Sequence, residues 1–290
     1  LKDIENNIDQ NPQKKSALRV VVHSFFVVPF IIAIFAVLIF LVTRIMTAEP
    51  NTAQDYLEDV KIGGATKRWQ GAFELSKILS NPKMVPKDNR FVTEMITTFE
   101  YAINDRDIRI RQFLAIAMGA TGDKRYVETI IKALDQNDNE IIMACAFALG
   151  NLKDNRAVVH LLGLLDSPDP QVRLQSVIAL GKINDPNSTL PLEKMLADIE
   201  PNVRWDAAIA LAKQKNSSGR RIILDLLDRK YLNSFSNIDK VEQVQAMMVA
   251  INVAPLIQDS DLKQSLLELK ERDSNLKIRE AARIALLNFE

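Results

Sequence analysis

The segment from Asn184 to Lys213 reads NDPNSTLPLEKMLADIEPNVRWDAAIALAK, and it repeats the plan of the segment just before it. That upstream segment, Lys153 to Lys182, reads KDNRAVVHLLGLLDSPDPQVRLQSVIALGK. Each copy has turn-forming residues, a short apolar periodic stretch, further turn formers and a longer alanine-rich stretch. Apolar residues at helical spacing predict two helices per copy, and Pro170 suits the first turn of the second helix. The chain is therefore expected to consist of helical hairpins.

Single residues show the period of the repeat. Glycine recurs every 31 residues, at Gly119, Gly150 and Gly181, and Ala212 occupies the next position in the series. Arginine stands eight positions earlier in most copies, at Arg111, Arg173 and Arg204, with Ile142 in the remaining place. Weaker copies with Arg68 and Arg279 flank the regular ones. A fixed period of this length indicates stacked units, which predicts an all-α solenoid of about seven hairpins over residues 63–290.

The repeat also resembles a known family. The stretch DPQVRLQSVIALGKINDPNSTLPLEKML, from Asp169 to Leu196, is similar to HEAT repeats, in particular the short bacterial form also found in phycobilin lyases. The resemblance covers the chain from about Arg68 to its C-terminus. It implies a right-handed solenoid whose second helices line the concave side. It also implies that Arg173 bridges units by pairing with Asp154 or Asp185, with a gap at Ile142.

A long apolar segment precedes the array. Residues 20–43, VVVHSFFVVPFIIAIFAVLIFLVT, contain no Asp, Glu, Lys or Arg. A helix of this length spans about 36 Å at about 1.5 Å per residue, enough to cross a hydrocarbon core of about 30 Å. The apolar part of a signal peptide is shorter, about 7–15 residues. We therefore predict a transmembrane helix in which Pro29 is tolerated as a kink.

This segment divides the chain and suggests its orientation. The predicted parts are a tail over 1–19, a transmembrane helix over 20–43, a linker over 44–62 and the array over 63–290. More basic residues precede the span than follow it, namely Lys2, Lys14, Lys15 and Arg19 against Arg44 and Lys61. The excess predicts a single-pass protein of the inner membrane with a cytoplasmic N-terminus and an extracytoplasmic (periplasmic) array.

Groups that could carry chemistry are few. Lys plus Arg and Asp plus Glu both number 37, so the balance indicates no nucleic-acid partner. The sequence has two histidines, one cysteine and no phosphate-binding or serine-nucleophile motif. Cys145 is expected to be a buried, inert thiol, and His160 a core or half-buried residue. We predict no catalytic residue, cofactor, metal site or small-molecule substrate, and no enzymatic activity.

The places one and five residues after the arginine carry an unusual composition. The family resemblance implies that they point outward and are commonly charged, but nine of ten are apolar here. They lie four residues apart and so share one helix face. The residues are Trp69, Phe73, Gln112, Ile116, Met143, Phe147, Leu174, Ile178, Trp205 and Ile209. One interpretation is an exposed stripe that binds a protein partner, with the nine apolar residues as contacts. The alternative is that they pack between units or against the first helices.

These features predict a non-enzymatic, membrane-anchored HEAT-repeat scaffold. It would serve as an accessory or assembly subunit of an integral membrane complex and bind its partner through an apolar concave groove. Two alternatives remain open from the sequence. One is a carrier or chaperone for a lipid, a lipidated protein or an apolar segment. The other is an enzyme similar to the phycobilin lyases.

Overall fold

A computed structural model of the 290-residue chain describes residues 23–47, 51–236 and 238–289. These residues form helices, turns and loops, and none of them lies in a strand. The chain divides after Asn51 into two units, Leu1–Asn51 and Thr52–Glu290. The predicted N-terminal tail and the first residues of the predicted span lie outside the described residues.

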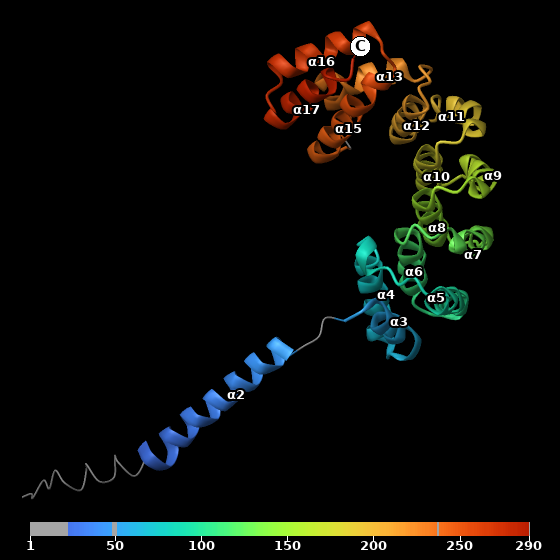
Figure 1. Cartoon of the computed structure of the whole chain (residues 1–290). Coiled ribbons are helices and arrows are strands. Elements are labelled where there is room, and N and C mark those ends of the chain that lie inside the picture. The colour runs from blue at the N-terminus through green and yellow to red at the C-terminus, as the bar shows by residue number, and fades with distance from the viewer. Residues whose placement is uncertain (1–22, 48–50, 237, 290) are drawn as a thin grey trace, which may run out of the picture. The chain divides into compact units, whose positions relative to one another are not determined.

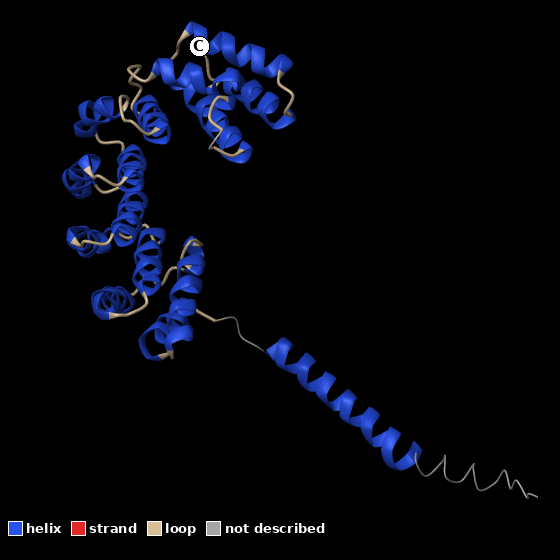
Figure 2. Ribbon diagram, turned by 180° about the vertical axis from the view of Figure 1, so that it is seen from behind, coloured by secondary structure: helices blue, strands red, loops and turns tan. Residues whose placement is uncertain are grey.

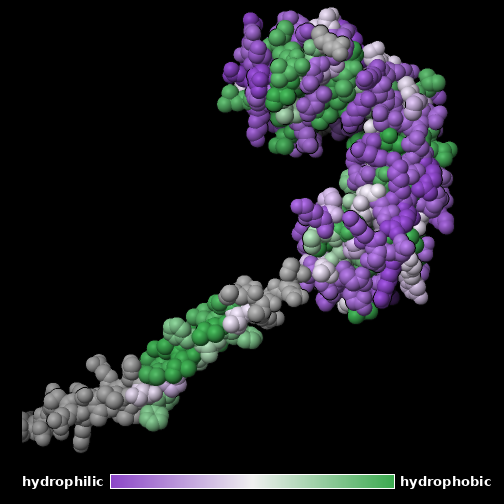
Figure 3. Space-filling view, viewed as in Figure 1, coloured by the Kyte–Doolittle hydropathy of each residue, from purple (hydrophilic) through white to green (hydrophobic). Residues whose placement is uncertain are grey.

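The N-terminal unit contains one long apolar helix. A π-helical turn, η1 (His23–Val27), leads directly into α2 (Val28–Thr47). Pro29 is the second residue of α2 and has no N–H to donate to the turn before it. The irregularity expected at the proline thus takes the form of a π turn. Residues Ser24–Thr43 are long and apolar enough to cross a membrane, and the helix surface is mostly apolar (Figure 3).

The second unit is built from seven successive helical pairs among the described residues, which agrees with the predicted all-α solenoid. The helices that come first in their pairs are α3 (Ala53–Ile62), α5 (Asn89–Tyr101), α7 (Val127–Lys132), α9 (Val158–Gly163), α11 (Thr189–Met195), α13 (Arg220–Leu226) with α14 (Arg229–Asn233), and α16 (Ser260–Arg272). Those that come second are α4 (Ala65–Ile78), α6 (Ile108–Ala120), α8 (Asn139–Leu152), α10 (Pro170–Ile183), α12 (Pro201–Lys213), α15 (Lys240–Val253) and α17 (Leu276–Leu286).

Short 3₁₀ segments complete many of the hairpins. They are η2 (Pro82–Met84), η3 (Ala102–Asn104), η4 (Lys124–Tyr126), η5 (Ala133–Asp135), η6 (Asn155–Ala157), η7 (Leu164–Asp166), η8 (Pro186–Ser188) and η9 (Ala254–Leu256). Within this unit, α4, α6, α8, α10 and α12 stack side by side along the inner side of a curve (Figures 1 and 2). Helices α5, α7, α9 and α11 form the outer layer. The second helices of the hairpins therefore line the concave side.

The array begins earlier than the sequence predicts. The predicted linker over 44–62 contains α3, whose Leu57 and Val60 are fully buried. Thr52 and Asp55 cap this helix reciprocally: the Asp55 amide donates to the Thr52 hydroxyl at 3.2 Å, and the Thr52 amide donates to the Asp55 carboxylate at 2.8 Å. Such a capping box fixes a helix start. Residues 53–62 therefore belong to the first hairpin, and Gly63 and Gly64 form the turn inside it.

A recurrent aspartate starts each new unit after the glycine. Asp123, Asp154 and Asp185 follow their glycines by four residues, and each accepts a hydrogen bond from the backbone amide two residues on, at 2.8–3.0 Å. Asn216 does the same in the next unit, at 2.7 Å. These side chains satisfy amide groups that a helix start leaves without partners. These residues recur with the same period as the glycines because each caps the first turn of a new hairpin.

The recurrent glycine marks where neighbouring second helices approach most closely. A Cβ atom added to Gly119 would lie 2.5 Å from the Ala148 Cα, and one added to Gly150 would lie 2.8 Å from the Ala179 Cα. Only a residue without a side chain allows the two backbones to meet at this distance. The glycine series is therefore a packing requirement between α6, α8, α10 and α12.

Replacing Gly150 with alanine is expected to lower the free energy of unfolding by about 1–3 kcal/mol, because the new methyl group meets backbone atoms that no rotamer change can move. The gain in helix propensity, about 1 kcal/mol, does not offset this clash. Gly163→Ala is the matched control, since a Cβ at Gly163 meets nothing within 4 Å. The control should raise stability by about 0.5–1 kcal/mol. Denaturant titrations followed by circular dichroism measure both; equal effects would contradict the packing role of Gly150.

Candidate partner-binding face

The concave side carries a row of mostly apolar side chains. We call it the inner stripe and define it by two residues from the second helix of each of four successive hairpins. They are Trp69 and Phe73 (α4), Gln112 and Ile116 (α6), Met143 and Phe147 (α8), and Leu174 and Ile178 (α10). Phe73 is exposed and the other seven are half-buried. The stacking of α4, α6, α8 and α10 places these pairs next to one another, so the stripe is continuous over four units.

Cationic side chains lie over the aromatic rings of the inner stripe. The Arg109 guanidinium is 4.3 Å from the Trp69 ring centre, and the Lys182 ammonium is 4.6 Å from that of Phe147. The Lys77 ammonium is 5.1 Å from the Phe73 ring centre, and the Phe113 ring packs against Phe73 in an edge-to-face arrangement with the ring centres 5.2 Å apart. Such cation–π contacts are worth about 0.5–1 kcal/mol at exposed sites. The stripe thus presents apolar side chains together with aliphatic stems that end in positive charge.

Trp205 and Ile209 do not lie on the exposed stripe that the sequence predicts. They are only 4% and 5% exposed. The Trp205 ring lies 5.2 Å from the Phe235 ring and 6.3 Å from the Tyr231 ring, and its indole N–H donates to the Tyr231 hydroxyl at 3.2 Å. Both residues belong to a second hydrophobic core, formed with α13–α17, that meets the first core at α12. Core packing, the alternative interpretation, holds for this pair, and the stripe ends at α10.

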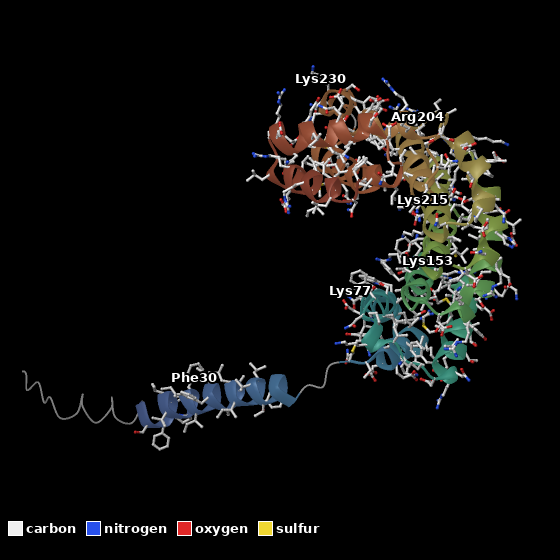
Figure 4. The ribbon with its side chains drawn as sticks, turned by 45° about the horizontal axis from the view of Figure 1, so that its top comes forward. Phe30, Lys77, Lys153, Arg204, Lys215 and Lys230 are labelled. Atoms are coloured by element: carbon white, nitrogen blue, oxygen red, sulfur yellow. The ribbon has the colours of Figure 1, made fainter. Side chains whose placement is uncertain are left out.

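Lysines recur at the C-terminal ends of the inner helices. Lys182, in the last turn of α10, donates a hydrogen bond to the Asn151 side chain at 2.9 Å and has no carboxylate partner in the described part of the array. Burial lowers the pKa of Lys182, and the charges of Lys213 and Lys153 lower it further. Lys153, in the turn after α8, and Lys215, in the turn after α12, are labelled in Figure 4. The C-terminal ends of these helices favour positive charge, which offsets part of the mutual repulsion.

The arginine series bridges units, but with different partners from those that the family resemblance implies. Arg173 pairs with neither Asp154 nor Asp185; its guanidinium binds both oxygens of Asp198, at 2.8 and 2.9 Å. The side-chain hydrogen bond with Arg173 lowers the pKa of Asp198. The Arg111 guanidinium donates a hydrogen bond to the side-chain oxygen of Gln136, at the equivalent place in its own repeat. Each of these two arginines thus ties its helix to the loop inside the next hairpin and has a structural role.

The arginine series has a gap at Ile142, as the family resemblance implies. Ile142 has no polar group for the loop that follows, whose equivalent residue is Ser167. The Ser167 carbonyl accepts a hydrogen bond from Arg173 of the same hairpin at 2.9 Å instead.

The residues considered for chemistry do not converge. Cys145 is fully buried, as predicted, and burial raises its pKa to about 12, so its thiol is not a nucleophile at neutral pH. The prediction of a core or half-buried His160 is wrong, because its side chain is exposed on α9. In the described part of the chain, no three His, Cys, Asp or Glu side chains are grouped so that they could hold a metal ion.

The fold and this face define an α-solenoid of helical repeats with an apolar inner stripe. The family of HEAT repeats matches the chain at residues 96–170 and 159–232. The chain therefore carries HEAT repeats, as its sequence predicts, and its array is a HEAT-repeat solenoid. No curated protein gives a significant sequence match.

Solved structures resemble this array. The complex of CpcE and CpcF of phycocyanin lyase from Nostoc sp. PCC7120 matches with a TM-score of 0.60 and 18% identity, covering 83% of this chain and 89% of that one. A designed armadillo repeat protein matches with a TM-score of 0.39 and 16% identity, covering 83% of this chain and 100% of the other. The likeness to CpcE and CpcF concerns the fold alone.

Proposed function

We propose that this protein is a non-enzymatic scaffold that binds a protein partner along the inner stripe while α2 holds it in a membrane. The observation that carries the proposal is the stripe itself. Apolar side chains, with Gln112 as the one polar exception, occupy the same two places on four successive helices, and all of them remain at least partly accessible to solvent. A continuous apolar surface of this kind is typical of interaction sites.

The architecture suits such a role. Solenoids hold extended concave surfaces rigidly, so a partner is bound without ordering the scaffold. The apolar and aromatic side chains fit an amphipathic helix or an extended apolar segment. Anchoring by α2 would confine the array near the bilayer and raise the effective concentration of membrane-embedded partners. We therefore propose an integral membrane complex as the partner and an accessory or assembly role for this chain.

The proposed location is the inner membrane, crossed once, with the N-terminus in the cytoplasm and the array on the periplasmic side. The support is the length and composition of α2 and the excess of basic residues before it in the sequence. Those four preceding basic residues lie outside the described residues.

The non-enzymatic part of the proposal has its own support. The one thiol, Cys145, is held protonated by burial, and the one histidine of the array, His160, is exposed on an outer helix. The likeness to CpcE and CpcF concerns a scaffold built from the same kind of hairpins. The inner stripe of this chain offers apolar contact and positive charge rather than a reactive group.

The test is a double substitution, Phe73→Glu with Phe147→Glu, in the full chain. Buried carboxylates at an apolar interface are costly, so we expect partner affinity to fall at least about thirtyfold, as for interface hot spots. Helical content and the melting midpoint should stay close to those of the parent, because both rings are partly exposed. Co-purification from mild detergent with quantitative mass spectrometry measures the loss.

Val159→Glu with Leu190→Glu is the matched control. These side chains are 69% and 70% exposed on α9 and α11, in the outer layer. The control should keep its partner. Two outcomes would contradict the proposal: unchanged binding by the Phe73 and Phe147 variant, or unfolding of that variant, which would make the rings core residues. Lipid that co-purifies in stoichiometric amount in place of a protein would favour the carrier alternative.

A further inference from the structure

A cavity of about 260 Å³ opens where α10, α12 and α15 meet. These helices are neighbours in the array (Figure 1). Both apolar and polar side chains line the cavity. They include Leu174 (α10), Trp205, Asp206 and Ile209 (α12), and Glu242, Gln245 and Val249 (α15). Leu174 also belongs to the inner stripe, so the cavity continues the stripe beyond its last helix. No Lys, Arg or His is among the lining residues.

Asp206 is the unusual group in this cavity. Its half-buried carboxylate forms no hydrogen bond or ion pair with any described residue, whereas the buried Asp273 binds Arg229 at 2.5 and 2.7 Å. Burial raises the pKa of Asp206 to about 6, and the charge of Lys213 opposes this shift without cancelling it. Lys213 is seven residues farther along the same helix, about 10.5 Å away along its axis. A carboxylate held among apolar walls without a partner lowers the stability of the fold.

We propose that this cavity receives the positively charged side chain of a lysine or arginine from the bound partner. The proposal rests on the proposed function, since the partner segment would run along the inner stripe and reach the cavity at Leu174. The aliphatic stem would pack against Ile209 and Val249, and the charged end would pair with Asp206. Glu242 on the facing wall adds a second negative charge.

The size of the cavity supports one side chain as its occupant. Sites for drug-sized ligands measure about 300–1,000 Å³, and this one is smaller. An apolar side chain would cover Asp206 and leave it unpaired, and a neutral amide would donate a hydrogen bond without supplying a positive charge. An acidic side chain would face two carboxylates. The cavity thus selects a positive charge at one residue of the partner, while the stripe selects apolar residues in the rest of the bound segment.

The experiment is an affinity selection of capped peptides by the full chain in mild detergent. The peptides carry Leu, Ile or Phe at the fixed positions and Lys, Arg, Gln or Glu at one varied position. We expect Lys and Arg to be enriched about tenfold over Gln, because a hydrogen bond between opposite charges is stronger than one from a neutral amide. Asp206→Asn should remove the enrichment. Asp166→Asn, which changes an exposed carboxylate of the outer layer, is the matched control and should retain it.

The folded state of the Asp206→Asn variant is checked separately. A carboxyl whose folded pKa is raised destabilises the fold increasingly from its unfolded pKa of about 4 up to about 6, and fully above that. The variant should therefore melt at a higher temperature than the parent at pH 8 and at nearly the same temperature at pH 3.5. Lost selection then reports lost binding, because the variant remains folded.

Two results would overturn the proposal: no enrichment of Lys or Arg by the parent chain, or enrichment that persists in Asp206→Asn. Either result leaves the proposed function standing if the Phe73 and Phe147 variant still loses its partner. Conversely, if the native partner is found to bind away from the stripe, the proposed function fails, but a selection for Lys or Arg that depends on Asp206 would still be observed.

Discussion

Trp205→Ala is expected to lower the free energy of unfolding by about 3–5 kcal/mol, the usual cost of removing a large buried aromatic side chain. Trp205 is 4% exposed, packs against Tyr231 and Phe235, and donates to the Tyr231 hydroxyl. Its loss would leave a cavity and an unpaired hydroxyl. Denaturant titration followed by circular dichroism measures the change.

The other tryptophan of the chain is the control. Trp69 is half-buried on the inner stripe, and one ring face is covered by the Arg109 side chain. Trp69→Ala should cost only about 1–2 kcal/mol, since less apolar area is removed from the interior. Equal losses for the two variants would mean that Trp205 is as accessible as Trp69, which would contradict its place in the second core.

The position of Trp205 also predicts where the destabilised chain opens. Units of a solenoid contact mainly their neighbours, so a local defect acts on adjacent hairpins first. Trp205 belongs to the core shared with α13–α17, while the buried residues of α3–α10 belong to the other core. Hydrogen exchange in the Trp205→Ala variant should therefore rise in residues 220–286 and stay near the parent value in residues 53–183.

Removing the apolar helix is expected to move the protein completely from the membrane fraction to the soluble fraction. A chain that starts at Thr52 keeps every helix of the array, including the capped α3, and forms one compact unit. The full chain should resist extraction by alkaline carbonate and enter detergent, because α2 is long and apolar enough to span a bilayer. The shortened chain should be soluble with undiminished helical content per residue.

A point variant separates membrane insertion from a simple loss of chain length. Ile34→Lys with Leu38→Lys places two charges near the middle of α2, each costing about 2.5–3.5 kcal/mol for insertion. Ile34→Leu with Leu38→Ile conserves the apolar character and should insert normally. Carbonate extraction of the unmodified full chain, or pelleting of the shortened chain with membranes, would contradict anchoring by α2.

The hairpins and their period could be read from the sequence because the signals are local. Helical apolar spacing, proline at a first turn and glycine at a constant interval each act within one unit or between adjacent units. The helix at 53–62 also had a local signal, the capping pair Thr52 and Asp55, which the prediction of a linker overlooked. The glycine series showed the period of the repeat from the sequence alone. The reason for the glycines, close contact with Ala148 and Ala179 of the next helix, became visible only in the packed structure.

The burial of Trp205 depends on contacts that composition does not show. Its partners Tyr231 and Phe235 lie in the following hairpin, in α14 and in the polar connection after it. In sequence, Trp205 continues the same series as Trp69. Only the placement of the C-terminal helices beside α12 distinguishes the two residues. Similarly, Arg173 had several aspartates within reach in sequence, and the loop geometry selects Asp198.

The most direct measurement of partner binding by the inner stripe is site-specific photo-crosslinking in native membranes. A photoreactive residue would replace Ile116 or Ile178, on α6 and α10, and in control chains Val159 or Leu190, on the outer layer. Binding through the stripe predicts that both inner positions crosslink to the same membrane-complex protein and that the outer positions do not. Crosslinks to that protein from the outer positions alone would contradict it.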